Sequence, residues 1–136
     1  MAPHPASGSP PRAIVTGTSS GIGAAVAARL LADGWLVQGL DIAPATLTHR
    51  HFQAHRVDLL APGLLETLVT QCLATGPVQA LVHAAGVLRT APLGQLNEAD
   101  GLAMWQLHVQ ACTRLANALL PAMAQAGQGR VVLVGS

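Results

Sequence analysis

The residues best suited to chemistry form a glycine-rich turn between an apolar run and a helix-favouring stretch. The run begins at Arg12 and leads into Thr16-Gly-Thr-Ser-Ser-Gly-Ile-Gly23. Glycines at such a turn let backbone N–H groups approach a pyrophosphate, which the positive end of the following helix stabilises. The strand before and the helix after favour this interpretation over a tight turn that needs glycine only for its geometry. A P-loop is excluded, because its essential Lys is missing from a chain that contains no Lys.

An acidic residue, Asp41, follows the second apolar run, about 20 residues after the glycines. A carboxylate at this point accepts hydrogen bonds from the adenosine ribose hydroxyls and repels a 2′-phosphate. No Arg lies in the glycine turn or immediately after Asp41 to offset that repulsion. The pattern therefore predicts NAD(H) rather than NADP(H). A solvated turn-forming Asp is the alternative.

The elements that must position these residues alternate between apolar strands and helices. Apolar runs predict five strands, over 12–17, 35–40, 52–57, 78–83 and 130–134. Helical spacing predicts helices over 22–32, 62–74 and 98–126, the last capped by Asn97 and kinked near Pro121. The segment 42–51 is predicted to be loop. Such alternation is typical of an α/β fold, a doubly wound parallel sheet with helices on both faces.

Composition excludes several classes of protein. The chain is 51% hydrophobic and 10% charged with a net charge of +1, so neither nucleic acid nor an anionic membrane is an expected partner. Cys72 and Cys112 are far apart within helical patterns, which favours buried thiols over a disulfide or a metal site. We expect a disordered tail over residues 1–11, which lack the features of a signal peptide, and a cytoplasmic location.

Five segments, in order along the chain, resemble the signatures of the short-chain dehydrogenase/reductase family. They match its TGxxxGxG turn, its acid-aliphatic pair, a variant of its NNAG motif, the end of its central helix and its serine-bearing strand; the matching residues are Thr16–Gly23, Asp58-Leu59, Ala84-Ala85-Gly86, Leu119–Met123 and Gly129–Ser136. The resemblance implies a Rossmann-like three-layer αβα domain over residues 12–136. It also implies a small alcohol or carbonyl substrate, whose identity stays open.

The resemblance assigns a role to individual residues. The pyrophosphate would be lined by the glycine turn, namely by Gly17, Ser19, Ser20, Gly21, Ile22 and Gly23. The adenosine ribose would contact Asp41, and the adenine would lie between Asp58 and Leu59. The nicotinamide ribose would lie above Ala84, Ala85 and Gly86. Ser136 would be the catalytic serine that bonds the substrate oxygen.

Two histidines depart from the family pattern. His83 stands where the family has the first Asn of NNAG, and we expect it to be a packed histidine that replaces part of that bonding. His108 stands where the family has the Asn of its catalytic tetrad. A histidine there could carry a proton, since its pKa lies near physiological pH, or could be satisfied by packing alone.

The family's catalytic Tyr and Lys are absent, because the chain contains neither residue type. We expect the natural chain to continue past Ser136 with this pair and to act as an NAD(H)-dependent oxidoreductase. The alternative is a non-catalytic NAD(P)-binding sensor or scaffold. The helix 98–126 is apolar on more than one side, which predicts a homodimer or homotetramer through that helix.

Overall fold

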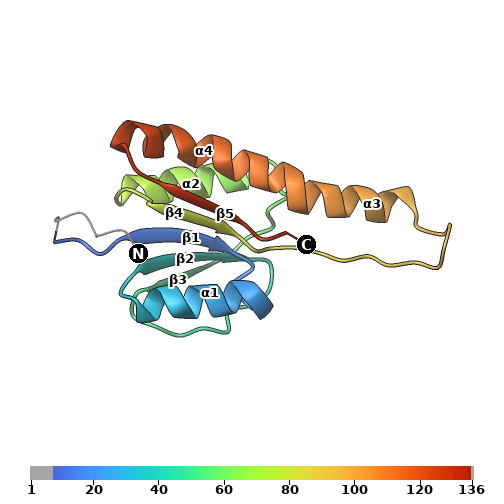
Figure 1. Ribbon diagram of the computed structural model, residues 1–136, viewed down its shortest axis with the longest axis horizontal. Coiled ribbons are helices and arrows are strands. Elements are labelled where there is room, and N and C mark those ends of the chain that lie inside the picture. Colours follow the sequence, from blue (N-terminus) through green and yellow to red (C-terminus); the bar gives the residue numbers. More distant parts are fainter. Residues whose placement is uncertain (1–7, 136) are drawn as a thin grey trace.

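The protein forms a five-stranded parallel sheet with helices on both faces (Figure 1). This computed structural model describes residues 8–135. The strands lie in the order β3-β2-β1-β4-β5, which confirms the predicted doubly wound sheet. The elements follow the chain as β1 (Arg12–Thr16), α1 (Gly21–Ala32), β2 (Leu36–Asp41), β3 (Phe52–Arg56), α2 (Leu64–Ala74), β4 (Ala80–His83), α3 (Glu98–Trp105), η1 (Gln106–Gln110), α4 (Ala111–Ala126) and β5 (Arg130–Leu133).

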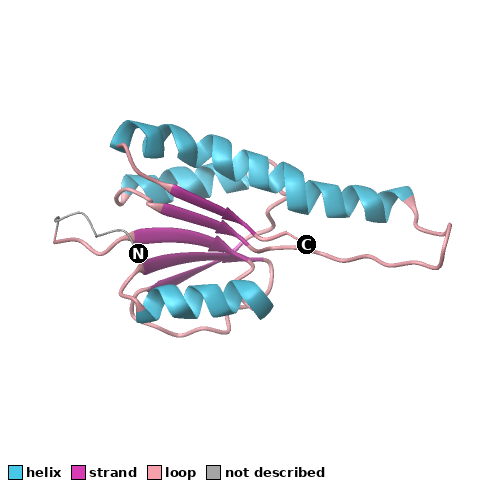
Figure 2. Ribbon diagram, in the orientation of Figure 1, coloured by secondary structure: helices cyan, strands magenta, loops and turns pink. Residues whose placement is uncertain are grey.

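The central strand β1 divides two apolar cores, because its successive side chains point to opposite faces. Ala13 and Val15 belong to the core under α1, together with Leu31. Ile14 faces the other way, into the core formed with α2 and α4, where Leu115 is fully buried. Figure 2 shows the resulting three layers, with α1 on one face and α2 and α4 on the other. The connection between β2 and β3 contains no helix over residues 42–51, as predicted.

The predicted helix 98–126 is divided by a π-helical turn, η1. Asn97 caps its start as expected, because its side-chain oxygen accepts a hydrogen bond from the Asp100 amide at 2.8 Å. At the end of η1, the Ala111 amide donates to the Gln106 carbonyl, five residues earlier, where an α-helix would use a residue four earlier. Pro121 lies inside α4, which continues to Ala126 and ends at Gly127 with φ 72°.

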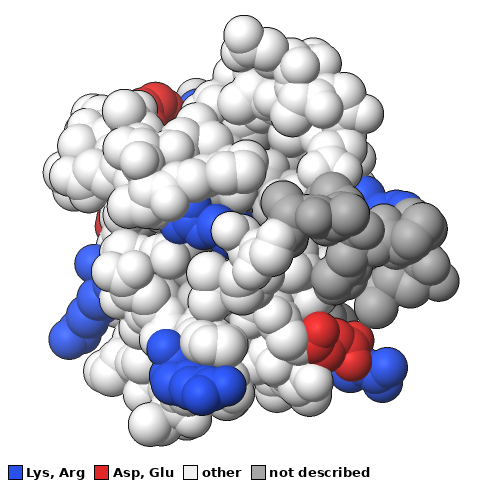
Figure 3. Space-filling model, turned by 90° about the vertical axis from the view of Figure 1, so that its left-hand side faces the viewer, with Lys and Arg blue, Asp and Glu red and all other residues white. Residues whose placement is uncertain are grey.

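Apolar surface remains exposed along one side of the described chain. Strand β5 lies at an edge of the sheet, and its Val132 and Leu133 are 50% and 58% exposed. On the α3–α4 segment, Trp105 and Val109 are about as exposed, at 52% and 48%. Most of the surface on the face drawn in Figure 3 is uncharged, and charged side chains appear there as scattered groups. Among residues 8–135, no helix combines the length and apolarity needed to cross a bilayer.

The expected N-terminal tail ends against the sheet. Pro11 is buried, and its carbonyl accepts a hydrogen bond from the Leu36 amide at 2.9 Å. Residues 1–7 lie outside the described part of the chain.

Candidate functional site

A pocket of about 550 Å³ opens where β1, β2 and β4 end and their loops begin. Ligands of open α/β sheets bind at this edge, outside the carboxyl ends of the strands. Ten of the residues assigned from sequence line the pocket: Gly17, Ser20, Gly21, Ile22, Asp41, Asp58, Leu59, Ala84, Ala85 and Gly86. The structure thus brings together residues that are up to about 70 positions apart in the chain.

The glycine turn has the close backbone packing that requires glycine. Gly17 has φ 76°, and a Cβ there would lie 2.9 Å from the Ala85 backbone. A Cβ at Gly23 would overlap the Gly17 carbonyl group. Ser20, the N-cap of α1, has extended φ and ψ and makes no side-chain cap bond with the described helix. The first amides of α1 are therefore left for an anion at the positive end of the helix.

Asp41 is oriented by backbone amides on both sides. One carboxylate oxygen accepts from the Ser19 amide and the other from the Ala43 amide, each at 2.9 Å. Ser19 also donates its hydroxyl to the Ala43 carbonyl at 3.2 Å. Ser19 therefore contributes by holding Asp41 and its loop, and it is absent from the residues that line the pocket. Gly23 is absent from them too, since its role is to let α1 approach β1.

An arginine close to Asp41 was not anticipated from the sequence. Arg56 lies directly opposite Asp41 in the β2–β3 pair, and its Nε donates to the Ile42 carbonyl at 3.0 Å. Sequence spacing from the glycine turn does not reveal this neighbour, because the pairing register of β3 determines it.

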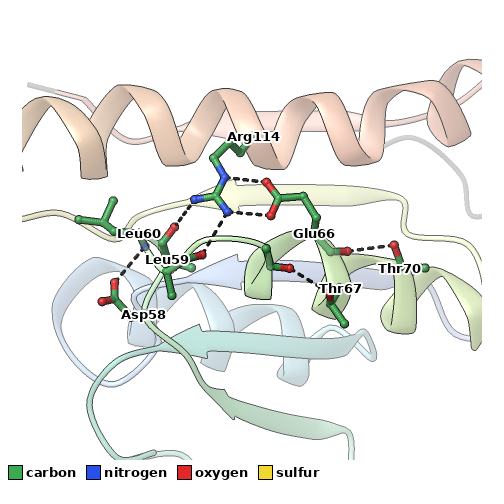
Figure 4. Close-up of polar contacts among 9 residues, drawn as sticks. Asp58, Leu59, Leu60, Glu66, Thr67, Thr70 and Arg114 are labelled. Carbon is green, nitrogen blue, oxygen red and sulfur yellow. Dashed lines mark hydrogen bonds and ion pairs between the residues drawn. The ribbon is translucent and has the colours of Figure 1, made fainter.

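The loop with Asp58 and Leu59 is held by Arg114 of α4, a second residue that the sequence did not single out. Arg114 donates to the Leu59 carbonyl at 3.0 Å and to the Ala61 carbonyl at 3.3 Å. Its guanidinium also makes a bidentate pair with Glu66 of α2, at 2.6 and 2.7 Å (Figure 4). One planar side chain thus joins α4, α2 and the loop that forms one wall of the pocket.

The Arg114 guanidinium holds the pKa of Glu66 down at about 2, mainly through its hydrogen bonds to the carboxylate. The pair raises the pKa of Arg114 in turn. Both groups therefore stay charged across the physiological range. No local sequence pattern marks this pair, because Arg114 contacts a loop and a helix that are remote in sequence.

Both ring nitrogens of His83 have partners, so this residue does more than pack. Nδ1 lies 2.8 Å from the Thr16 hydroxyl, and Nε2 lies 2.9 Å from the Leu107 carbonyl. The residue is 4% exposed. Burial lowers the pKa of His83 below its ordinary value, with the Leu107 carbonyl acting in the opposite direction.

His108, on the π-turn, contacts the chain just after Gly86. Its Nε2 lies 2.9 Å from the Val87 carbonyl oxygen and 3.2 Å from the Val87 amide nitrogen, so either tautomer can bond to this residue. A Cβ at Gly86 would lie 2.5 Å from the His108 ring. His108 does not line the pocket itself. The assigned Ser136 lies outside the described residues.

The chain is similar in sequence to known short-chain dehydrogenases. The family model for short chain dehydrogenases matches residues 11–136. A short-chain dehydrogenase/reductase of Penicillium canescens, olcF, is 32% identical over 90% of this chain and 50% of its own length. The short chain dehydrogenase ausX of Emericella nidulans is 34% identical over 90% of this chain and 66% of its own length.

Solved structures show the same arrangement. A short-chain dehydrogenase from Streptomyces avermitilis superposes with a TM-score of 0.88 at 31% identity, over 96% of this chain and 50% of the other. A 3-oxoacyl (acyl-carrier-protein) reductase from Agrobacterium tumefaciens with NADP bound has a TM-score of 0.83 at 30% identity, over 93% of this chain and 52% of the other. The chain thus spans about half the length of most of these relatives. With its glycine turn, its sheet order and these matches, the chain belongs to the short-chain dehydrogenase/reductase family of oxidoreductases.

Proposed function

We propose that this chain supplies the cofactor site of an NAD(H)-dependent oxidoreductase that interconverts a small alcohol and its carbonyl compound. The observation that supports this best is one pocket lined by the glycine turn, by Asp41 and by the 84–86 segment. Along the strand ends the order is Asp41 after β2, the glycine turn after β1 and the 84–86 segment after β4, which matches the adenosine ribose, pyrophosphate and nicotinamide ribose of an extended dinucleotide.

The residues present fit such a cofactor, because backbone rather than side chains borders the pocket at Gly17 and Gly86. A Cβ at Gly17 would collide with the Ala85 backbone, and one at Gly86 with His108. Amides at the start of α1 bind the pyrophosphate, and Leu59, which is 5% exposed, gives the adenine an apolar wall. When bound, the nicotinamide supplies the hydride or accepts it.

The preference for NAD over NADP rests on Asp41. Its carboxylate is fixed by the Ser19 and Ala43 amides, so it cannot turn away from a 2′-phosphate without losing both bonds. Arg56 lies nearby, and its Nε donates to the Ile42 carbonyl while its two Nη groups remain as donors. The family uses both cofactors, as the NADP-bound reductase of Agrobacterium tumefaciens illustrates, and Asp41 is the residue that selects between them here.

The proton transfer needs groups that the described residues do not contain. We assign Ser136 to the substrate oxygen, as the family resemblance implies, and a Tyr–Lys pair beyond residue 136 to the proton transfer. His108 bonds to Val87, just after the 84–86 segment, and does not itself line the pocket, so we assign it a supporting role in that segment. General acid–base catalysis of this kind contributes roughly a hundred- to ten-thousandfold in rate.

The same proposal includes a homodimer or homotetramer formed through the helical segment 98–126. Leu102, Trp105, Val109 and Leu120 are between 46% and 53% exposed along it. Apolar side chains gathered on one helical segment favour a protein partner over water.

The test measures the affinity of the natural gene product for NAD⁺ and NADP⁺ by isothermal titration calorimetry. Asp41→Ala should weaken NAD⁺ binding by about tenfold or more, as expected for the loss of charge-assisted bonds to the ribose. The difference between the affinities for NAD⁺ and NADP⁺ should become smaller. Asp33→Ala is the matched control. Asp33 lies at the opposite end of α1, paired with Arg29, and its removal should leave both affinities unchanged.

Unchanged NAD⁺ affinity in Asp41→Ala would show that this residue does not contact the ribose. Binding of neither cofactor by the wild type would refute the proposed site. Tight binding without turnover of a panel of aldehydes, ketones and alcohols would favour the sensor or scaffold instead.

A further inference from the structure

Two buried polar side chains, Thr16 and His83, meet beneath the pocket between β1 and β4. The Thr16 hydroxyl oxygen accepts from the Ala84 and Ala85 amides, each at 3.0 Å, and lies 2.8 Å from His83 Nδ1. A hydroxyl has two acceptor lone pairs and one proton. Because a backbone amide N–H only donates, the two amides use both lone pairs of the Thr16 hydroxyl oxygen. The hydroxyl proton must therefore go to His83. His83 Nδ1 is therefore the acceptor, and the ring proton lies on Nε2.

That Nε2 proton serves the π-turn. It is donated to the Leu107 carbonyl at 2.9 Å. In an α-helix this carbonyl would accept from the Ala111 amide, but here the Ala111 amide bonds to Gln106. The π-turn therefore costs Leu107 its usual helical donor, and the side chain of His83 replaces it. Single π-turns within helices frequently occur at functional sites.

We propose that His83 is a positioning residue that holds the glycine turn and the π-turn in register around the cofactor pocket. This inference rests on the proposed function of that pocket. Thr16 directly precedes Gly17, and both Gly17 and Leu107 line the pocket. A single neutral ring thus sets the spacing between two of its walls.

The role requires a neutral ring. An imidazolium donates from both nitrogens. The Thr16 oxygen has no lone pair left for a third donor, so protonation of His83 breaks this link. The same network therefore predicts that cofactor affinity falls as the pH falls, which a residue with a fixed hydrogen-bonding pattern would not cause.

The elements packed against His83 carry one histidine and two arginines. On η1 the titratable neighbour is His108, whose charge would lower the pKa of His83 further. On β1 and β5 the charged residues are Arg12 and Arg130. Both lie at the other end of their strands, near Ala80, which is three residues and about 10 Å from His83.

The test uses the natural gene product with two substitutions, His83→Gln and His83→Asn, each of which can replace only one of the two hydrogen bonds of the ring. Gln at position 83 has the length to place its amide where Nε2 lies, whereas Asn reaches only to the place of Nδ1. NADH affinity is measured by fluorescence titration from pH 8 to pH 5, and backbone hydrogen exchange of residues 106–112 is measured without cofactor. His55→Gln is the control, since His55 is half-buried, is bonded to Gln38 and does not line the pocket.

In the wild type and in His55→Gln, NADH affinity should be lower at pH 5 than at neutral pH. In His83→Gln it should be nearly independent of pH, while His108→Asn should still show the fall, moved toward higher pH because the neighbouring charge is gone. In His83→Asn, the amides of residues 106–112 should exchange about fivefold faster, because the hydrogen bond to the Leu107 carbonyl is lost.

Wild-type pH dependence in His83→Gln, or unchanged exchange in His83→Asn, would overturn the inference. Failure of the wild type to bind NADH at any pH would instead refute the proposed function. The exchange measurement would then still decide whether His83 holds the π-turn.

Discussion

Replacing Gly23 by Ala tests the close approach of α1 to β1 on which the pyrophosphate site depends. A Cβ at Gly23 would lie 2.5 Å from the Gly17 carbonyl carbon and 2.9 Å from the Thr16 oxygen. Ordinary contacts begin near 3.4 Å, and the opposing atoms are backbone, so no side chain can turn aside. The turn or the helix must therefore move by about 1 Å.

A shift of that size weakens the hydrogen bonds from the α1 amides to the charged pyrophosphate, and a loss of about 2–3 kcal/mol in binding corresponds to about a hundredfold in affinity. The overpacking itself costs about 1–3 kcal/mol in stability. We expect calorimetry to give an NAD⁺ dissociation constant about a hundredfold above that of the wild type. Gly101→Ala is the matched control. Gly101 lies in α3 with no atom within 4 Å of an added Cβ, so that variant should bind normally and be slightly more stable. Wild-type affinity in a folded Gly23→Ala variant would refute the reasoning.

Two further predictions concern stability, measured by urea unfolding of the natural gene product. Arg114→Leu should lower the free energy of unfolding by about 2 kcal/mol, because two loop carbonyls and a bidentate carboxylate lose their donor. As the control, substitution of the exposed Arg29 by Leu should change the free energy of unfolding by less than about 0.5 kcal/mol. Equal effects of the two substitutions would contradict the role given to Arg114. Burial lowers the folded-state pKa of His55 and His83 below 6.5, so the unfolded chain binds more protons below that pH and stability should fall from about pH 6.5 toward pH 5. A flat profile over that range would show that neither ring is held neutral.

The sequence was sufficient for the parts of the site that depend on local chemistry. The glycine turn and Asp41 were each predicted from a strand end followed by a particular residue type, and the 84–86 segment was implied by the family resemblance. The parallel sheet then brought them to one pocket, since the carboxyl ends of parallel strands share an edge. Helix and strand bounds were also close to those predicted, apart from the interruption of the long helix.

The features that the sequence did not reveal all depend on tertiary contacts. The π-turn differs from an α-helix by one shifted hydrogen bond at Ala111, which leaves the apolar periodicity almost unchanged. His83 was expected to be a packed histidine that replaces part of the family's bonding, and its two partners became visible once β1 and η1 were placed beside β4. Arg114 and Arg56 contact loops that are remote in sequence, so no local pattern marks them.

The most direct test of the central claim is a crystal structure of the natural gene product with NAD⁺. We predict that the pyrophosphate lies at the first amides of α1, beside Gly17 and Gly21. The adenosine ribose should bond to Asp41, and the nicotinamide ribose should lie over Gly86. A dinucleotide bound in another place, or bound here with its adenosine end away from Asp41, would contradict the assignment of this pocket.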